Sequence, residues 1–225
     1  MTSTLQQQAS AQFRSNPKNT MRIAQRLYEA GHITYMRTDK AVMSQEAQDA
    51  ARAWVEHTYG AAYIGPLNPQ KKGKAKEEKN AQEAHEAIRP THMEVTELPH
   101  DDGTEWSSLD RNIYRMIWQR AIQSVMAPTK GETCSLQLQI DEDTDFTWSA
   151  SWRHTIFEGW RKAGQIAEIE EQEDNAVKEE NDADWTAVTS IQPGDPVSWS
   201  SIQAHPIETK AKGRYNEATL VKELE

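Results

Sequence analysis

The residues of this sequence best suited to chemistry lie in one short segment, His32-Ile33-Thr34-Tyr35-Met36-Arg37-Thr38-Asp39. In an extended chain Tyr35 and Arg37 lie on one face, and Thr34, Met36 and Thr38 on the other, because side chains alternate. A phenol has a pKa of about 10 and attacks poorly unless positive charge favours the phenolate. An arginine suits phosphate, since its guanidinium donates to two oxygens at once and stays charged. The pair is therefore a candidate for attack on a phosphate ester, although the spacing alone more often means a strand aromatic beside a surface cation.

A helix is predicted directly before this segment. Asn16-Pro17 is typical of an N-cap followed by proline in the first turn, and Gly31 is typical of a C-terminal stop. Between them the apolar positions recur at spacings of three and four, at Met21, Ala24, Leu27 and Tyr28. The helix therefore fixes where the Tyr35 segment begins.

The rest of the first 130 residues also has helical patterns. We predict helices from Ser44 to Gly60, over 81–88, and from Ser107 to just before Pro128. Residues 61–80 contain the run KKGKAKEEK without periodicity and are predicted to form a loop.

The pattern changes to that of strands after Gly131. Leu136-Gln137-Leu138-Gln139-Ile140 and the stretch from Phe146 to Trp152 alternate apolar and polar residues, with DEDTD between them as a hairpin loop. The acidic residues 168–184 are predicted to form a solvated loop, 197–202 suggests another strand, and the tail after Arg214 begins a helix. The predicted fold class is α+β, with a helical part followed by a β-rich part.

Composition excludes several classes of protein. No run of about 18 apolar residues spans a membrane, and the N-terminus lacks the layout of a secretory signal. The single cysteine, Cys134, excludes a disulfide framework and a cysteine-based zinc site. The aspartates at 141, 143 and 145 imitate a calcium loop, but Phe146 and Trp152 stand where glycine and glutamate are needed. We expect a cytoplasmic protein whose chain holds no metal.

The net charge of −10 argues against nucleic acid as a partner only if it is evenly spread. Residues 1–130 hold 17 basic and 15 acidic side chains, whereas residues 131–208 hold 4 basic and 17 acidic. Within the first part, residues 1–40 hold 6 basic and 2 acidic side chains. Polyanion affinity depends on local cation density, so the segment around Tyr35 can tolerate phosphates while the later part repels them.

Four stretches, in order along the chain, resemble the type IA DNA topoisomerases, bacterial topoisomerase I in particular. They are TSTLQQ from Thr2, QRLYE from Gln25 with GHITYMRTD from Gly31, NAQEAHEAIRPT from Asn80, and RYNEATLVK from Arg214. Met36 favours topoisomerase I over the topoisomerase III branch.

The resemblance implies roles for individual residues. Tyr35 would be the nucleophile that becomes linked to a 5′ phosphate, and Arg37 would position that phosphate and stabilise its developing charge. His85 would contact DNA phosphate near the tyrosine. The other positions that match support the site or touch DNA; they are Gln25, Glu29, Thr34, Thr38, Asp39, Arg89 and Thr219.

The resemblance also implies an organisation. Residues 1–127 would form a helical, helix-turn-helix-like domain with the tyrosine, 128–205 a β-rich arch or hinge, and 206–225 the start of a domain that grips single-stranded DNA. The family holds Mg²⁺ in a separate Toprim domain, so we expect this chain to be a central fragment that binds no Mg²⁺ and does not cleave alone. The parent would be a monomer in the bacterial cytoplasm, associated with the nucleoid, acting on single-stranded and negatively supercoiled DNA.

Two other functions stay open at this point. The chain could be a DNA-binding module with a helix-turn-helix-like surface and no catalysis, or its acidic β-rich half could be a protein-interaction domain. Acidic Toprim motifs upstream in the coding sequence favour the enzyme over the module. Binding to single-stranded DNA that falls steeply with salt counts against the interaction domain.

Overall fold

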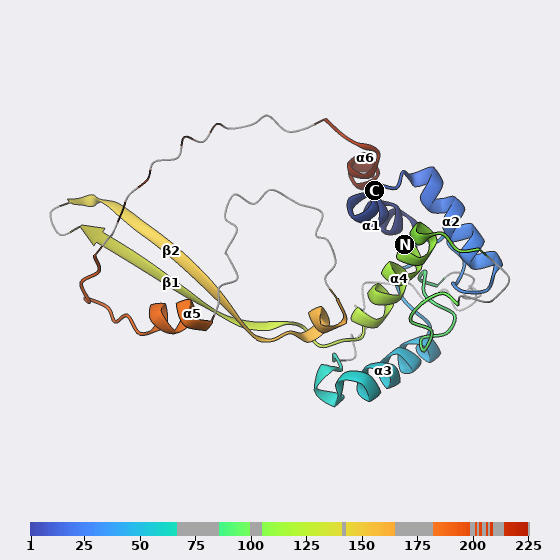
Figure 1. Cartoon of the computed structure of the whole chain (residues 1–225), viewed down its shortest axis with the longest axis horizontal. Helices are drawn as coiled ribbons and strands as arrows, with labels where there is room; N and C mark the ends of the chain where they lie inside the picture. The colour runs from blue at the N-terminus through green and yellow to red at the C-terminus, as the bar shows by residue number, and fades with distance from the viewer. Residues whose placement is uncertain are drawn as a thin grey trace, which may run out of the picture. The chain divides into compact units, whose positions relative to one another are not determined.

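The structure is a computed structural model that describes residues 1–66, 86–99, 105–140, 143–164, 182–198 and 214–224, with the single residues 201, 203, 206 and 208. The described residues form two compact units. The first consists of residues up to 128, from 159 to 164 and from 215 to 224, and the second of residues 129–158 and those from 182 to 214. Helices dominate the first unit and a two-stranded sheet the second (Figure 1).

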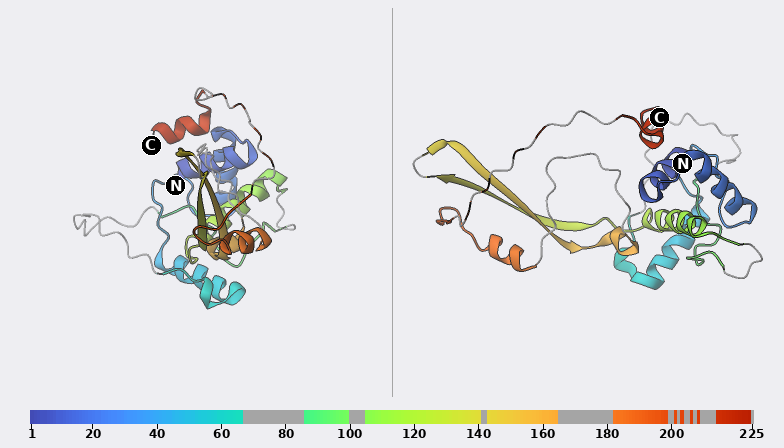
Figure 2. Two further views of the ribbon diagram at one scale, coloured as in Figure 1. Left: turned by 90° about the vertical axis from the view of Figure 1, so that its left-hand side faces the viewer. Right: turned by 45° about the horizontal axis from the view of Figure 1, so that its top comes forward.

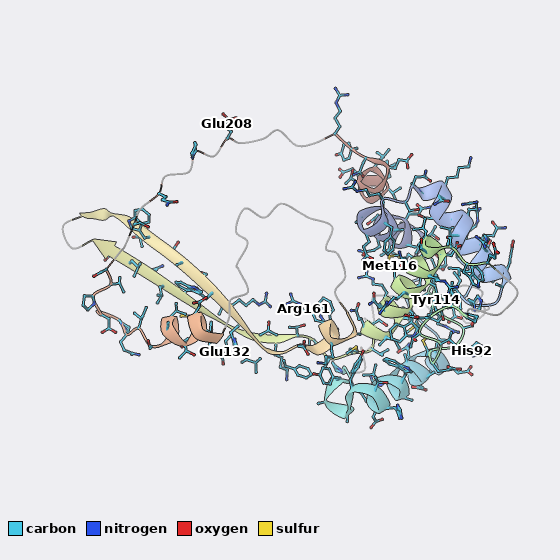
Figure 3. All side chains as sticks on the ribbon, in the orientation of Figure 1. His92, Tyr114, Met116, Glu132, Arg161 and Glu208 are labelled. Carbon is cyan, nitrogen blue, oxygen red and sulfur yellow. The ribbon has the colours of Figure 1, made fainter. Side chains whose placement is uncertain are left out.

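The first unit is organised around one central helix. Its helices are α1 (Thr2–Phe13), α2 (Pro17–Glu29), α3 (Gln45–Tyr59), α4 (Ser108–Gln123) and α6 (Glu217–Leu224), with short 3₁₀ turns η1 (Ala61–Tyr63) and η2 (Gly159–Ala163). Figure 2 shows α4 between α1 and α3, and α6 packs against α1. Tyr114 and Met116 of α4, labelled in Figure 3, belong to the core shared with α1 and α2, whereas Ile122 belongs to the core shared with α3. The helix therefore divides the apolar interior into two clusters and joins them.

Side-chain caps fix the helix ends that the sequence predicts. The Asn16 side chain accepts a hydrogen bond from the Asn19 amide at the start of α2, and that of Ser44 does the same for the Ala47 amide at the start of α3. Ser107 and Asp110 form a reciprocal capping box at the start of α4. These predicted helices are confirmed because short-range chemistry sets their boundaries.

The Asp110 carboxylate also joins α4 to α2. The Arg26 Nη1 atom lies 3.1 Å from Asp110 Oδ2, and the Arg26 guanidinium lies 5.1 Å from the centre of the Trp106 ring. The α2 helix, which leads into the Tyr35 segment, is therefore held to α4 by an ion pair as well as by apolar packing.

The second unit is a hairpin with one helix on it. Strands β1 (Lys130–Ile140) and β2 (Asp143–Phe157) are antiparallel, and α5 (Asp182–Thr189) contacts β2. The apolar side chains share one face because Cys134 pairs with Trp152, Leu136 with Ala150 and Leu138 with Trp148. His154 of β2 stacks on Trp185 of α5 with ring centroids 5.3 Å apart. The predicted hairpin is confirmed, and both of its strands extend beyond the alternating residues that predicted them.

Some predicted elements differ from the structure. Asp182 and Asp184 belong to α5 rather than to the predicted solvated loop. Residues 86–88 are not helical, because the Ala87 amide donates to the Val42 carbonyl instead of to its own segment. Val197 lies in irregular backbone rather than in a strand.

Other predictions lie outside the described residues. These are the loop over 67–80, the first part of the helix predicted over 81–88, the acidic stretch before residue 182, and the strand positions Trp199 and Ile202.

The broad fold class is confirmed as helices with a small antiparallel sheet. The boundary predicted after residue 127 lies one residue before the break between the units. Residues 159–164 and 215–224 belong to the first unit, because η2 packs on α4 and α6 on α1. Within the described ranges, no helix is both long and apolar enough to cross a bilayer.

Candidate active site

The segment that carries Tyr35 begins at a sharply defined helix end. The Gly31 amide donates to the Tyr28 carbonyl and the His32 amide to the Leu27 carbonyl, which together form a Schellman cap on α2. Gly31 has a φ of 79°, a left-handed conformation that a side chain would disfavour. The chain therefore leaves α2 in a fixed direction immediately before the candidate nucleophile.

The backbone of the segment is irregular, and its side chains alternate as predicted only from Tyr35 to Thr38. The segment forms a single β-bridge, between Ile33 and Pro90, instead of the expected extended strand. The chain around Pro90 runs beside the segment for only a few residues. Ile33, Met36 and Thr38 are buried, whereas Tyr35 and Arg37 are exposed. The buried side chains anchor the segment and leave the phenol and the guanidinium on the accessible side.

Tyr35 has a second tyrosine as its neighbour. The rings of Tyr35 and Tyr28 meet edge to face, with centroids 5.3 Å apart and an angle of 70° between their planes. Both side chains are about two-fifths exposed, at 41 % for Tyr35 and 42 % for Tyr28. The Tyr35 ring is therefore supported on one side by α2 while part of it stays accessible.

Two cations follow the tyrosine. Arg37 is exposed and forms no ion pair with any residue that the structure describes. Lys40 Nζ lies 4.0 Å from Asp39 Oδ2, with both side chains largely in solvent, so that pair is weak. The Arg37 charge is thus available to a phosphate group close to Tyr35.

Thr34 binds the backbone of Arg89 through both its amide and its hydroxyl. The Thr34 amide donates to the Arg89 carbonyl at 2.9 Å, and the Arg89 amide donates to Thr34 Oγ1 at 3.0 Å. Thr34 Oγ1 itself donates to the Ala87 carbonyl at 2.8 Å. The residue immediately before Tyr35 is therefore fixed to the segment that follows position 85.

The Arg89 side chain is bound to a carboxylate. Its Nε and Nη2 atoms donate to the two oxygens of Glu86 at 2.9 and 2.8 Å, and Nη1 donates to the Pro90 carbonyl at 2.9 Å. Burial by itself raises the pKa of Glu86, but the hydrogen bonds from Arg89 and the Ser44 amide, with the arginine charge, hold it below its ordinary value. In this arrangement the Arg89 guanidinium faces protein groups.

Thr38 is 7 % exposed and is held by the start of α1. The Thr2 amide donates to the Thr38 carbonyl at 2.9 Å, and the Thr38 amide donates to Thr2 Oγ1 at the same distance. Thr2 Oγ1 also donates to the Met36 carbonyl at 2.9 Å. The segment is thus fixed after Tyr35 by Thr2 as well as before it by Arg89.

The remaining predicted residues have separate places. Gln25 and Glu29 form a hydrogen bond of 2.8 Å with each other on the exposed side of α2. Thr219 forms a reciprocal cap with Asn216 at the start of α6, because its amide donates to Asn216 Oδ1 and its hydroxyl oxygen accepts from the Asn216 amide. His85 lies outside the described residues.

Sequence reasoning gave Tyr28, Glu86 and Thr2 no role of their own at the site. Each lies inside a stretch that carried the family resemblance, and that is the one signal that could have identified it. The sequence separation is 7 positions between Tyr28 and Tyr35, 42 between Glu86 and Ser44, and 36 between Thr2 and Thr38. Chemically, the arrangement places a supported phenol two positions before a guanidinium that has no ion pair within the described part of the chain.

Comparison with known proteins agrees with the resemblance. The family described as DNA topoisomerase matches residues 1–225. DNA topoisomerase 1 from Mycolicibacterium smegmatis is 40 % identical over all of this chain, which covers 23 % of that protein. DNA topoisomerase 1 from Synechococcus elongatus is 38 % identical over all of this chain and 24 % of its own length.

A solved structure has the same fold. Full-length topoisomerase I from Thermotoga maritima superposes with a TM-score of 0.66 and 28 % sequence identity, covering 99 % of this chain and 33 % of that one. The chain therefore spans about a quarter of the length of the curated relatives it matches. It belongs to the family of bacterial type IA DNA topoisomerases.

Proposed function

We propose that Tyr35 is the nucleophile of a DNA topoisomerase that cuts one strand, passes another through the break, and reseals the first. The observation that carries the proposal is an accessible phenol on a buried, hydrogen-bonded segment, with an exposed guanidinium two residues later. The substrate would be single-stranded DNA exposed by negative supercoiling, and the outcome relaxation of those supercoils.

The chemistry balances without an external energy source. The Tyr35 oxygen attacks a backbone phosphorus, loses its proton, and forms a phosphotyrosine with the 5′ phosphate. The bond to the 3′ oxygen of the preceding nucleotide breaks, and that oxygen takes up a proton. One phosphodiester replaces another, so the reverse attack by the 3′ hydroxyl reseals the strand without ATP.

Arg37 has two roles in this proposal. Its fork binds the non-bridging oxygens of the phosphate that Tyr35 attacks, which places the phosphorus near the phenol. It also stabilises the negative charge that develops on those oxygens in the transition state.

The two units would serve different parts of the reaction. The helical unit with Tyr35 would contain the helix-turn-helix-like surface that receives DNA, and the long hairpin would belong to an arch that acts as the hinge of the gate. The end of the chain would lead into the domain that grips single-stranded DNA. The whole enzyme would act as a monomer on the chromosome in the bacterial cytoplasm.

Magnesium enters the proposal only for the whole enzyme. Among the described residues, no three His, Cys, Asp or Glu side chains converge, so these residues offer no ligand set for the ion. We propose that the ligands lie in another domain of the parent protein and that these 225 residues alone do not cleave DNA.

Covalent trapping tests the proposal. Full-length protein is incubated with a labelled single-stranded oligonucleotide and Mg²⁺, denatured, and examined for label on the protein. Tyr35→Phe should abolish the adduct while the matched Tyr28→Phe variant retains it. An adduct on Tyr35→Phe would overturn the assignment of Tyr35 as the nucleophile, and no adduct on the wild type would favour a non-catalytic DNA-binding module. Cleavage by the isolated 225 residues would contradict the second half of the proposal.

A further inference from the structure

Glu86 connects the start of a helix with the arginine that fixes Thr34. Its Oε2 accepts from the Ser44 amide at 3.2 Å and from Arg89 Nε at 2.9 Å, while Oε1 accepts from Arg89 Nη2 at 2.8 Å. Ser44 is the N-cap of α3, so the carboxylate lies at the positive end of that helix. A single carboxylate therefore joins α3 to the segment beside the nucleophile.

The ion pair between Glu86 and Arg89 differs in geometry and in exposure from an ion pair at the surface. The side chains of Arg89 and Glu86 are 16 % and 31 % exposed, and the contact is bidentate. By contrast, the pair of Arg115 and Glu97 is separated by 3.7 Å with both side chains over 60 % exposed. A bidentate, shielded pair fixes orientation in a way that an exposed single contact does not.

This connection ends one residue before Tyr35. The Arg89 backbone holds Thr34 through two hydrogen bonds, one to the Thr34 amide and one to its hydroxyl, and Thr34 directly precedes the proposed nucleophile. A displacement of Arg89 is therefore passed to Thr34 through these hydrogen bonds, and from Thr34 to Tyr35 through the peptide bond that joins them.

From these contacts we infer that Glu86 and Arg89 are positioning residues for the Tyr35 nucleophile, with their ion pair setting where the phenol lies relative to the phosphate. The inference rests on the proposed function of Tyr35. It assigns Arg89 to protein rather than to DNA, because its guanidinium is occupied by Glu86 and the Pro90 carbonyl. It also gives α3 a part in cleavage, since the Ser44 amide binds the same carboxylate.

The test compares cleavage with binding in the full-length protein. The variants are Glu86→Gln, which keeps the shape and removes the charge, and Arg89→Lys, which keeps the charge and loses the fork. Glu97→Gln is the matched control on the exposed pair. Single-turnover formation of the covalent adduct should fall at least about tenfold in the first two variants, because small displacements of a reacting group are costly. The dissociation constant for the uncleaved oligonucleotide and its dependence on salt should stay within about twofold of wild type.

A direct contact between Arg89 and DNA predicts a different result. Arg89→Lys would then retain much of the cleavage rate, whereas Arg89→Ala would weaken oligonucleotide binding and lower the salt slope by about one. That result would overturn the inference, as would wild-type cleavage rates in Glu86→Gln.

Coupling and rescue keep the test informative if a variant is less stable. The losses in Arg89→Ala and Glu86→Ala should not add in the double variant, because each breaks the same pair. Added guanidinium ion at millimolar concentration should restore adduct formation to Arg89→Ala and not to the double variant. Additive losses, or rescue independent of Glu86, would contradict the inference. Loss of the adduct in Tyr35→Phe, checked in parallel, separates failure of this inference from failure of the proposed function.

Discussion

Replacing Asp110 by alanine should destabilise the helical unit by about 2–3 kcal/mol. The Asp110 side chain is 1 % exposed. Its Oδ2 accepts hydrogen bonds from the Ser107 amide at 2.8 Å and the Ser107 hydroxyl at 2.7 Å, and it faces Arg26 Nη1 at 3.1 Å. One carboxylate thus caps α4 and ties it to α2.

The size of the expected loss in stability follows from the two roles of Asp110, as part of the cap of α4 and as the partner of Arg26. Loss of the cap costs about 1 kcal/mol. Loss of a hydrogen bond to a charged group costs about 1.5–3 kcal/mol. We take the lower part of that range, because the Arg26 side chain is 38 % exposed and regains water when its partner is removed. For a protein of this size each kcal/mol lowers the melting temperature by about 2–4 °C.

Urea and thermal unfolding followed by far-UV circular dichroism measure the effect, since α1 to α4 lie in the helical unit and dominate the helical signal. Ser107→Ala removes the hydroxyl of the capping box but keeps the contact between Asp110 and Arg26, and it should cost about 1 kcal/mol. Asp49→Ala, on the exposed side of α3, should change stability by less than about 0.5 kcal/mol. The reasoning is refuted if Asp110→Ala costs no more than Ser107→Ala, because the bond to Arg26 would then contribute nothing.

Three further predictions use the same preparations. Gly31→Ala should lower the free energy of unfolding in urea by about 1–2 kcal/mol, and Gly31→Asn by less. A Cβ at this position meets no atom within 4 Å, so only the left-handed φ is unfavourable. Equal losses in the two variants would contradict this. The lowered pKa of Glu86 means that its contribution to stability is present above its unfolded pKa and is lost as the pH falls through the folded value. Glu86→Gln should therefore cost about 1 kcal/mol at neutral pH and less as the pH falls below 4.5, and a constant difference would refute that reasoning. Trp185→Ala should increase hydrogen exchange in β2 around His154 while leaving the melting of the helical unit unchanged, because the stacked pair lies within the second unit; unchanged exchange would argue against the stack.

The sequence predicts best those features that neighbouring residues determine. The ends of α2 follow from Asn16, Pro17 and Gly31, all within a residue or two of the boundary. The alternation of Leu136 and Leu138 predicts the hairpin because the period of a strand is visible over five residues. The exposed and buried sides of the Tyr35 segment are predictable for the same reason, even though a regular strand does not form.

The contacts that hold the candidate site could not be predicted in this way. Thr2 binds Thr38, and Glu86 binds the Ser44 amide, across separations of 36 and 42 positions that no local pattern reveals. Residues 86–88 have a helical composition, yet their hydrogen bonds are made with Val42 and Thr34 in the tertiary structure. The sequence thus indicates the candidate residues for the chemistry, whereas the fold determines which residues hold them in place.

The most direct test of the central claim is to locate the DNA on the protein. Full-length wild-type enzyme is trapped on a short oligonucleotide, digested with protease and nuclease, and the modified peptide is sequenced by mass spectrometry. The account predicts a 5′-phosphate linkage on Tyr35, in the peptide that contains Thr34 and Met36. Attachment to Tyr28, whose ring lies 5.3 Å away, or to any other residue would contradict it.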